Sequence, residues 1–129
     1  MGVRVMMIQN NKIWLVRHTY VPGWYMPGGG LKRGETLADA ARREAFEETG
    51  AELAQVNLMG AYTNFTEWKT DHAIVFICND FTITGKSDGE IAEVGTFSLD
   101  ELPADVYPPH RLRLDEYRAG KNIPQFGEW

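Results

Sequence analysis

The first thirty residues alternate between apolar runs and turn-forming residues. Residues 3–8 and 13–17 are apolar runs, and Asn10-Asn11 between them readily adopts the left-handed conformation of a tight turn. This pattern predicts a β-hairpin. Residues 21–27 then lead into a run of glycines, where the backbone accepts dihedral angles that other residues resist.

A helix is predicted next, from Leu37 until Gly50. Thr36 and Asp39 form a capping box at its start, and Gly50 offers a left-handed stop at its end. One side of the helix carries small residues, which allow a close approach to a sheet. These small residues are Ala38, Ala41 and Ala45.

Longer strands are predicted in the second half of the chain. Residues 56–63 and 71–81 have strand character, and the near-continuous apolar run of residues 73–78 is typical of a strand buried on both faces. Residues 93–97 favour a further strand.

Helical signals follow the last of these strands. Ser98 with Glu101 is expected to cap a helical turn, and Pro108-Pro109 to open a helix that reaches Gly120. The whole order is strands, helix, strands, helix. It indicates an α+β fold with a sheet enclosed between two helices.

Acidic residues gather on one face of the first predicted helix. Glu44, Glu47 and Glu48 are spaced i, i+3 and i+4, and no lysine stands between them. A solvated acidic face would not need Glu35 and Arg43 at fixed offsets from a glycine run. A divalent cation would turn the repulsion between the carboxylates into attraction, and oxygen ligands of this kind suit Mg²⁺ or Mn²⁺.

Residues 29–51 resemble a complete Nudix box, G-x5-E-x7-R-E-U-x-E-E-x-G-U with U apolar. Gly29, Glu35 and the run from Arg43 to Ala51 match it; Ala45 and Ala51 are small where larger apolar residues are common. The resemblance to Nudix hydrolases implies an α/β/α sandwich with a mixed central sheet between helices. It also implies metal-dependent hydrolysis of a phosphoanhydride bond in a nucleoside diphosphate linked to another moiety.

The resemblance assigns roles within the box. Glu47 and Glu48 would bind the metal together with the backbone carbonyl of Gly28, while Glu44 would contact the metal through water or act as general base. Glu35 and Arg43 would hold the catalytic loop against the helix, because an Arg fork suits a carboxylate bidentately.

A loop after the box often supplies a further carboxylate in this family, as ligand or as base. Glu90 and Glu93 precede a predicted strand, so either residue is a candidate, with Glu90 ahead; each could also be an exposed loop acid.

Aromatic and basic residues beside the box are candidates for substrate binding. Aromatic faces commonly stack on nucleobases, but aromatic residues are more often part of a core. Arg17 could neutralise phosphate charge or lie on the surface. His18, His72 and His110 match no metal-ligand spacing and are expected to be structural, although His72 at a strand start could meet a phosphate. The aromatic candidates are Trp24, Tyr25, Phe65 and Trp68.

Length and charge limit the remaining choices. A chain of 129 residues predicts one domain, residues 1–129, and a net charge of −5 argues against binding a nucleic acid polymer and favours a small nucleotide. A lone Cys78 and the lack of a signal segment or long apolar span predict a cytoplasmic protein that does not bind a membrane. The oligomeric state stays open, a homodimer included.

Two alternatives share the fold. A catalytically silent Nudix-fold nucleotide-binding or sensor module would typically have lost box carboxylates, and all four are present here. An isomerase of isoprenoid diphosphates would need an active-site cysteine, whereas Cys78 lies in a predicted core strand. No additional subfamily motif is matched, so the base, sugar and phosphate count of the substrate stay open.

Overall fold

The structure, a computed structural model, describes residues 1–66, 69–120 and 124–129. Within these residues the chain forms a mixed seven-stranded sheet and two helices. The elements are β1 (Gly2–Gln9), β2 (Lys12–His18), β3 (Gly28–Gly30), α1 (Leu37–Thr49), β4 (Ala51–Thr66), β5 (Lys69–Ile83), β6 (Ile91–Ser98), α2 (Pro108–Ala119) and β7 (Phe126–Glu128).

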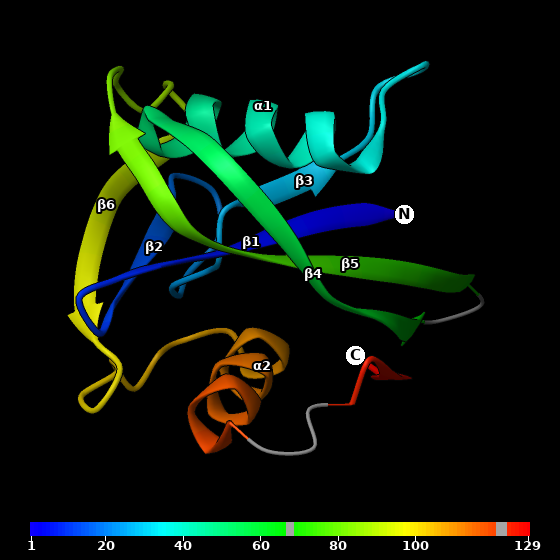
Figure 1. The fold of residues 1–129 in the computed structure, drawn as a ribbon. Helices are drawn as coiled ribbons and strands as arrows, with labels where there is room; N and C mark the ends of the chain where they lie inside the picture. The colour runs from blue at the N-terminus through cyan, green and yellow to red at the C-terminus, as the bar shows by residue number, and fades with distance from the viewer. Residues whose placement is uncertain (67–68, 121–123) are drawn as a thin grey trace.

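The sheet lies between the two helices, as the sequence predicted (Figure 1). Its strand order is β6-β2-β1-β5-β4-β7, with β3 paired to β1. β1 runs parallel to β5 and β4 parallel to β7, while the other pairs are antiparallel. The prediction of an α/β/α sandwich with a mixed central sheet is confirmed.

Alternation along β1 creates a core on each face of the sheet. Val3, Val5 and Met7 pack toward the small residues of α1, while Met6 and Ile8 belong to the cluster that contains Leu114 of α2. Strand β5 is likewise buried on both faces, as predicted for residues 73–78.

The turn and cap signals act as predicted. Asn10 and Asn11 both have positive φ, 54° and 59°, and connect β1 to β2. The Thr36 hydroxyl accepts a hydrogen bond from the Asp39 amide at 3.1 Å, and Gly50 ends α1 with φ of 76°.

Several boundaries differ from those predicted. β4 begins at Ala51 directly after the helix and runs for 16 residues, because pairing with β5 continues through polar positions that the local pattern did not mark as strand. β3 and β7 were not predicted. Ser98 and Glu101 form a hydrogen-bonded turn, and the fully buried small residues of α1 include Ala40 in place of Ala38.

Candidate active site

Glycines allow β3 to lie close to both β1 and α1. A Cβ on Gly28 would collide with the Val3 carbonyl oxygen and with Arg4 on β1. A Cβ on Gly29 would lie 2.7 Å from the Glu44 carboxylate. The glycine strand therefore brings its backbone against the acidic face of α1, which larger residues would prevent.

Arg43 ties the glycine segment to the helix. Its Nε and Nη2 donate to the two Glu35 carboxylate oxygens at 2.7 and 2.9 Å, and Nη2 also donates to the Gly30 carbonyl oxygen at 3.0 Å. Hydrogen bonding from Arg43 and then from the Lys32 amide lowers the pKa of Glu35 to about 2. The pair is therefore charged at neutral pH and fixes the loop between β3 and α1.

The third guanidinium nitrogen of Arg43, Nη1, contacts the acidic face of α1. Nη1 donates to Glu44 Oε1 at 2.7 Å and to Glu47 Oε2 at 3.3 Å. This contact sets the position of both carboxylates relative to β3.

Glu48 is the buried member of the acidic group, with only 6% of its surface exposed. Its Oε2 accepts a hydrogen bond from the Gly28 amide at 3.3 Å, whereas its buried Oε1 has no hydrogen-bond partner among the described residues. Burial first, and the neighbouring Glu44 carboxyl second, raise the pKa of Glu48 well above its ordinary value. Among the described residues Glu48 forms no ion pair, and the positive charge of Arg4 only partly opposes the rise in its pKa.

The carboxylates line a cavity of about 250 Å³, which we call the acid pocket. Glu44, Glu47 and Glu48 of α1 lie on one side of it, together with the backbone of Gly28 and Gly29. The residues that complete the lining are Arg4, His18, Tyr20, Asp88, Glu90 and Ile91.

The loop after β5 places Glu90 at the acid pocket. The Asp88 amide donates to the Glu47 carbonyl oxygen at 2.8 Å, and the Thr19 amide donates to the Glu90 carbonyl oxygen at 3.0 Å. Glu93 instead lies 3.7 Å from Arg17 in an exposed ion pair and does not line the pocket. Of the two loop candidates, the structure brings only Glu90 to the box carboxylates.

Two residues predicted to bind substrate lie elsewhere. Trp24 is 6% exposed and packs edge-on against Phe97 in the core on the α2 side. Arg17 forms ion pairs with Glu93 and Asp105 and lies over the Trp24 ring, 5.0 Å from its centroid. Neither lines the acid pocket, because proximity to the glycines in sequence does not place a side chain on the same side of the sheet.

The other aromatic candidates differ in position. Tyr25 is half-buried and stacks on Tyr107, with 4.9 Å between ring centroids. Phe65 is 64% exposed near the end of β4 and lines none of the described cavities, and Trp68 lies outside the described residues.

Sequence reasoning missed Arg4, His18 and Asp88. Arg4 had a signal, since it is the one charged residue in the apolar run of residues 3–8. His18 was expected to be structural, yet it lines the acid pocket and its buried Nδ1 has no hydrogen-bond partner among the described residues. Asp88 had no local signal.

A second cavity, of about 310 Å³, adjoins the acid pocket and shares Arg4 and Gly29 with it. We call it the aromatic cavity, because Tyr107, His110 and Trp129 line it.

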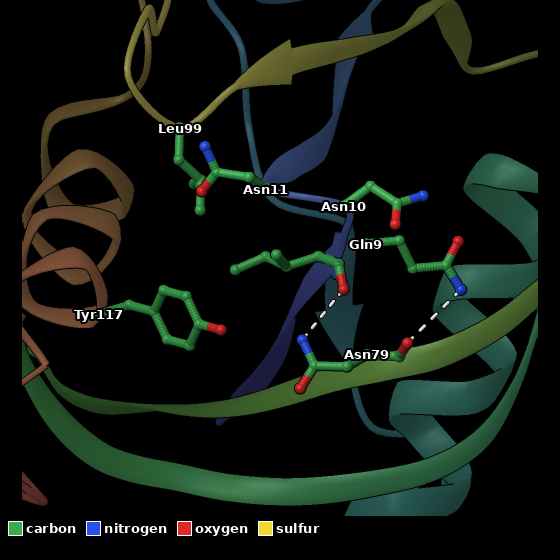
Figure 2. Close-up of a pocket in the computed structure, with 7 residues that line it drawn as sticks. Gln9, Asn10, Asn11, Asn79, Leu99 and Tyr117 are labelled. Carbon is green, nitrogen blue, oxygen red and sulfur yellow. Dashed lines mark hydrogen bonds between the residues drawn. The ribbon is translucent and has the colours of Figure 1, made fainter.

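A third cavity lies at the β1–β2 turn and contains none of the predicted site residues (Figure 2). Its amides are bonded within the protein: Gln9 Nε2 donates to the Phe81 carbonyl oxygen at 2.9 Å and Asn79 Nδ2 to the Ile8 carbonyl oxygen at 3.0 Å.

The acid pocket suits a divalent cation that brings most of its own ligands. No three acidic, histidine or cysteine side chains of the described residues form a complete metal centre by themselves. Mg²⁺ usually takes one or two protein carboxylates and completes its shell with waters and substrate phosphates. The unpartnered Glu48 Oε1 beside Glu44 and Glu47 matches that requirement.

Comparisons with known proteins agree with this geometry. Residues 1–117 match the family model described as the NUDIX domain. An ADP-ribose pyrophosphatase of Methanocaldococcus jannaschii is 31% identical over 119 residues, which cover 88% of this chain and 70% of that protein. An RNA pyrophosphohydrolase of Brucella ovis is 29% identical over 128 residues, covering 87% and 68%. A solved NUDIX hydrolase from Nitrosomonas europaea matches with a TM-score of 0.79 and 28% identity, covering 95% of this chain and 90% of that one.

Fold and pocket together define a hydrolase that acts on phosphorus-containing anhydrides. The chain belongs to the NUDIX family. The family prediction from residues 29–51 is thereby confirmed. Among the described residues, no helix is long and apolar enough to cross a membrane.

Proposed function

We propose that this protein cleaves a phosphoanhydride bond in a nucleoside diphosphate linked to another moiety, with Mg²⁺ or Mn²⁺ held in the acid pocket. The observation that carries the proposal is the convergence of Glu44, Glu47 and Glu48 on the glycine strand, with Glu48 Oε1 buried and unpartnered among the described residues. Hydrolysis of this kind agrees with the pyrophosphatase names of the relatives.

Glu47, Glu48 and the Gly28 carbonyl would hold the cation, with Glu44 and Glu90 as further oxygen ligands at the edge of the site. When bound, the cation neutralises the diphosphate and stabilises the charge of the leaving group. Arg43 and Glu35 orient this set, because their bidentate ion pair anchors the glycine segment to α1.

The protein's own part in the reaction is to orient and deprotonate water. The water oxygen attacks one phosphorus, the bridging P–O bond breaks, and the proton passes to a carboxylate. Glu44 and Glu90 are the candidates for that carboxylate, since both line the acid pocket. Loss of the acidic limb from the kcat–pH profile in Glu44→Gln or in Glu90→Gln would identify the base, because a general base stops working when it is protonated.

The substrate is a small nucleotide rather than a nucleic acid polymer. The net charge of −5 supports this choice, because a polymer footprint is usually basic. We also propose that residues 1–129 form one domain. We further propose that the protein is cytoplasmic, because its single cysteine, Cys78, is buried and free, as is common in a reducing compartment. Analytical ultracentrifugation would show whether the protein is a homodimer.

The test is a phosphate-release panel of nucleoside triphosphates, nucleotide sugars, ADP-ribose and dinucleotides, run with Mg²⁺ and then with Mn²⁺. Selective, metal-dependent hydrolysis would support the proposal and name the substrate. Tight nucleotide binding without turnover across the panel would contradict it and favour the silent sensor module.

Glu48→Gln tests the metal ligands directly. We expect kcat to fall by on the order of 10³-fold, comparable to the loss of a key electrostatic group, because the amide keeps the shape but not the charge. The fold should persist, since an amide is easier to bury than a carboxylate. Glu101→Gln, an exposed acid that lines none of the described cavities, is the matched control. Near-normal activity of the Glu48 variant would remove Glu48 from the ligand set.

A further inference from the structure

Arg4 stands at the junction of the acid pocket and the aromatic cavity, and it lines both. Its neighbours on β1, Val3 and Val5, are fully buried, so the position lies deep in the sheet. Within the described residues its guanidinium makes one hydrogen bond, from Nη1 to the Met26 carbonyl oxygen at 3.0 Å. A guanidinium carries five N–H donors, so most of its hydrogen-bonding capacity can serve a ligand.

The electrostatics of Arg4 favour an anion. Burial lowers the pKa of Arg4, and the negative charges of Glu48 and then Glu44 act in the opposite direction. A guanidinium stays protonated in proteins, so Arg4 presents a positive charge. A planar fork of donors beside the acid pocket matches phosphate geometry.

Beyond Arg4, the aromatic cavity combines the rings of Tyr107, His110 and Trp129 with polar groups that include Asn64, Asp71 and His72. Tyr107 directly precedes α2, His110 lies in the first turn of α2, and Trp129 follows β7. The centroids of the His110 and Trp129 rings are 5.2 Å apart. A volume of about 310 Å³ lies at the lower end of the range for small-molecule sites, which suits a nucleoside.

Trp129 is held in place by contacts on both its backbone and its ring. Its amide donates to the Thr63 carbonyl oxygen at 2.7 Å, continuing the parallel pairing of β7 with β4. Beneath it, Arg113 is 3% exposed and lies over the Tyr62 ring at 3.9 Å and the Trp129 ring at 5.9 Å. The indole is therefore a positioned wall of the cavity.

We propose that Arg4 binds the phosphate chain of the substrate where it leaves the acid pocket, and that Trp129 and Tyr107 receive the nucleobase in the aromatic cavity. This inference rests on the proposed function, because it places the rest of the same substrate. It makes Arg4 an anchor for the phosphates and Trp129 a residue that selects substrates with an aromatic base.

The test measures binding without turnover, by calorimetry with two probes. One is α,β-methylene-ADP, which keeps the base and resists cleavage at its phosphate bridge, and the other is inorganic pyrophosphate, which has no base. Trp129→Ala should weaken the nucleotide analogue by about 10- to 100-fold, as expected for loss of a base-stacking residue. Pyrophosphate binding should stay within about twofold, because stacking does not involve the phosphates.

Arg4→Gln should weaken both probes by about tenfold or more, since each loses hydrogen bonds from a charged donor. Matched controls are Phe126→Ala, a 78% exposed aromatic on β7, and Arg118→Gln, which pairs with Asp100 on the surface. Thermal melts identify any variant that fails to fold, and Trp129→Phe and Arg4→Lys then provide milder versions of each change.

Three results would overturn the inference: equal binding of the two probes by the unmodified protein, no effect of Trp129→Ala on the nucleotide analogue, or no effect of Arg4→Gln on pyrophosphate. Failure of the proposed function looks different. It would leave the hydrolysis panel silent, whatever these binding measurements give.

Discussion

Replacing Gly29 by alanine displaces one carboxylate of the acid pocket while altering little else. The new Cβ would lie 2.7 Å from Glu44 Oε1 and 2.8 Å from Glu44 Cδ. Non-bonded carbon atoms usually stand about 3.5–4.0 Å apart, so the carboxylate must retreat by roughly 1 Å.

This displacement should affect both turnover and stability. A shift of about 1 Å in a positioned group can lower turnover by about 10²-fold, so we expect kcat to fall by 10- to 100-fold. The hydrogen bond from Arg43 to Glu44, now 2.7 Å, would be strained, at a cost of about 1 kcal/mol. For a domain of this size that lowers Tm by only about 3–5 °C.

Gly30→Ala is the matched control, because a Cβ there meets no atom within 4 Å. Both variants are assayed for kcat and KM on the best substrate of the hydrolysis panel, and for Tm. Equal kcat values in the two variants, with Glu44 shown by crystallography to have moved, would refute the view that its position controls turnover.

Three further predictions concern the fold and the loop. Gly50→Ala should lower the free energy of unfolding by several kcal/mol in urea titrations, because Gly50 has φ of 76° and a Cβ would collide with Gly85. Burial lowers the pKa of His110 well below 6.5. Below about pH 6.5 the unfolded chain therefore binds a proton at this position that the folded chain does not bind. The free energy of unfolding should then fall by up to ~1.4 kcal/mol for each pH unit. The substitution His110→Gln should reduce this slope. Arg43→Lys should lower kcat about tenfold or more, because an ammonium cannot donate bidentately to Glu35.

The sequence revealed the acidic face because its geometry is local. Glu44, Glu47 and Glu48 are placed by helical spacing alone, and Thr36 and Gly50 mark both ends of that helix. The contact between Arg43 and Glu35 also spans only eight residues. Nothing beyond one loop and one helix is needed to arrange these groups.

The other side of the site depends on strand pairing between distant parts of the chain. Arg4 comes to the acid pocket because β1 pairs with β3 and β5, and Trp129 comes to the aromatic cavity because β7 pairs with β4. Periodicity within one segment contains no information on such pairing. Trp24 shows the reverse case, since it neighbours the glycines in sequence yet packs into the core on the α2 side.

The acid pocket, where we propose that hydrolysis occurs, and the aromatic cavity, where we propose that the base binds, are built from different parts of the chain. The acid pocket takes most of its carboxylates from one continuous segment, so a change in the box acts on turnover. The aromatic cavity shares Gly29 with the box but takes its side chains from β1, β4, β5, the start of α2 and the residue after β7, so changes in those side chains need not move a box carboxylate. Relatives with the same family domain carry different substrate names, ADP-ribose pyrophosphatase and RNA pyrophosphohydrolase among them. A cavity built from separate segments beside a locally built pocket is a physical arrangement that permits such divergence, with Arg4 as the side chain that touches both.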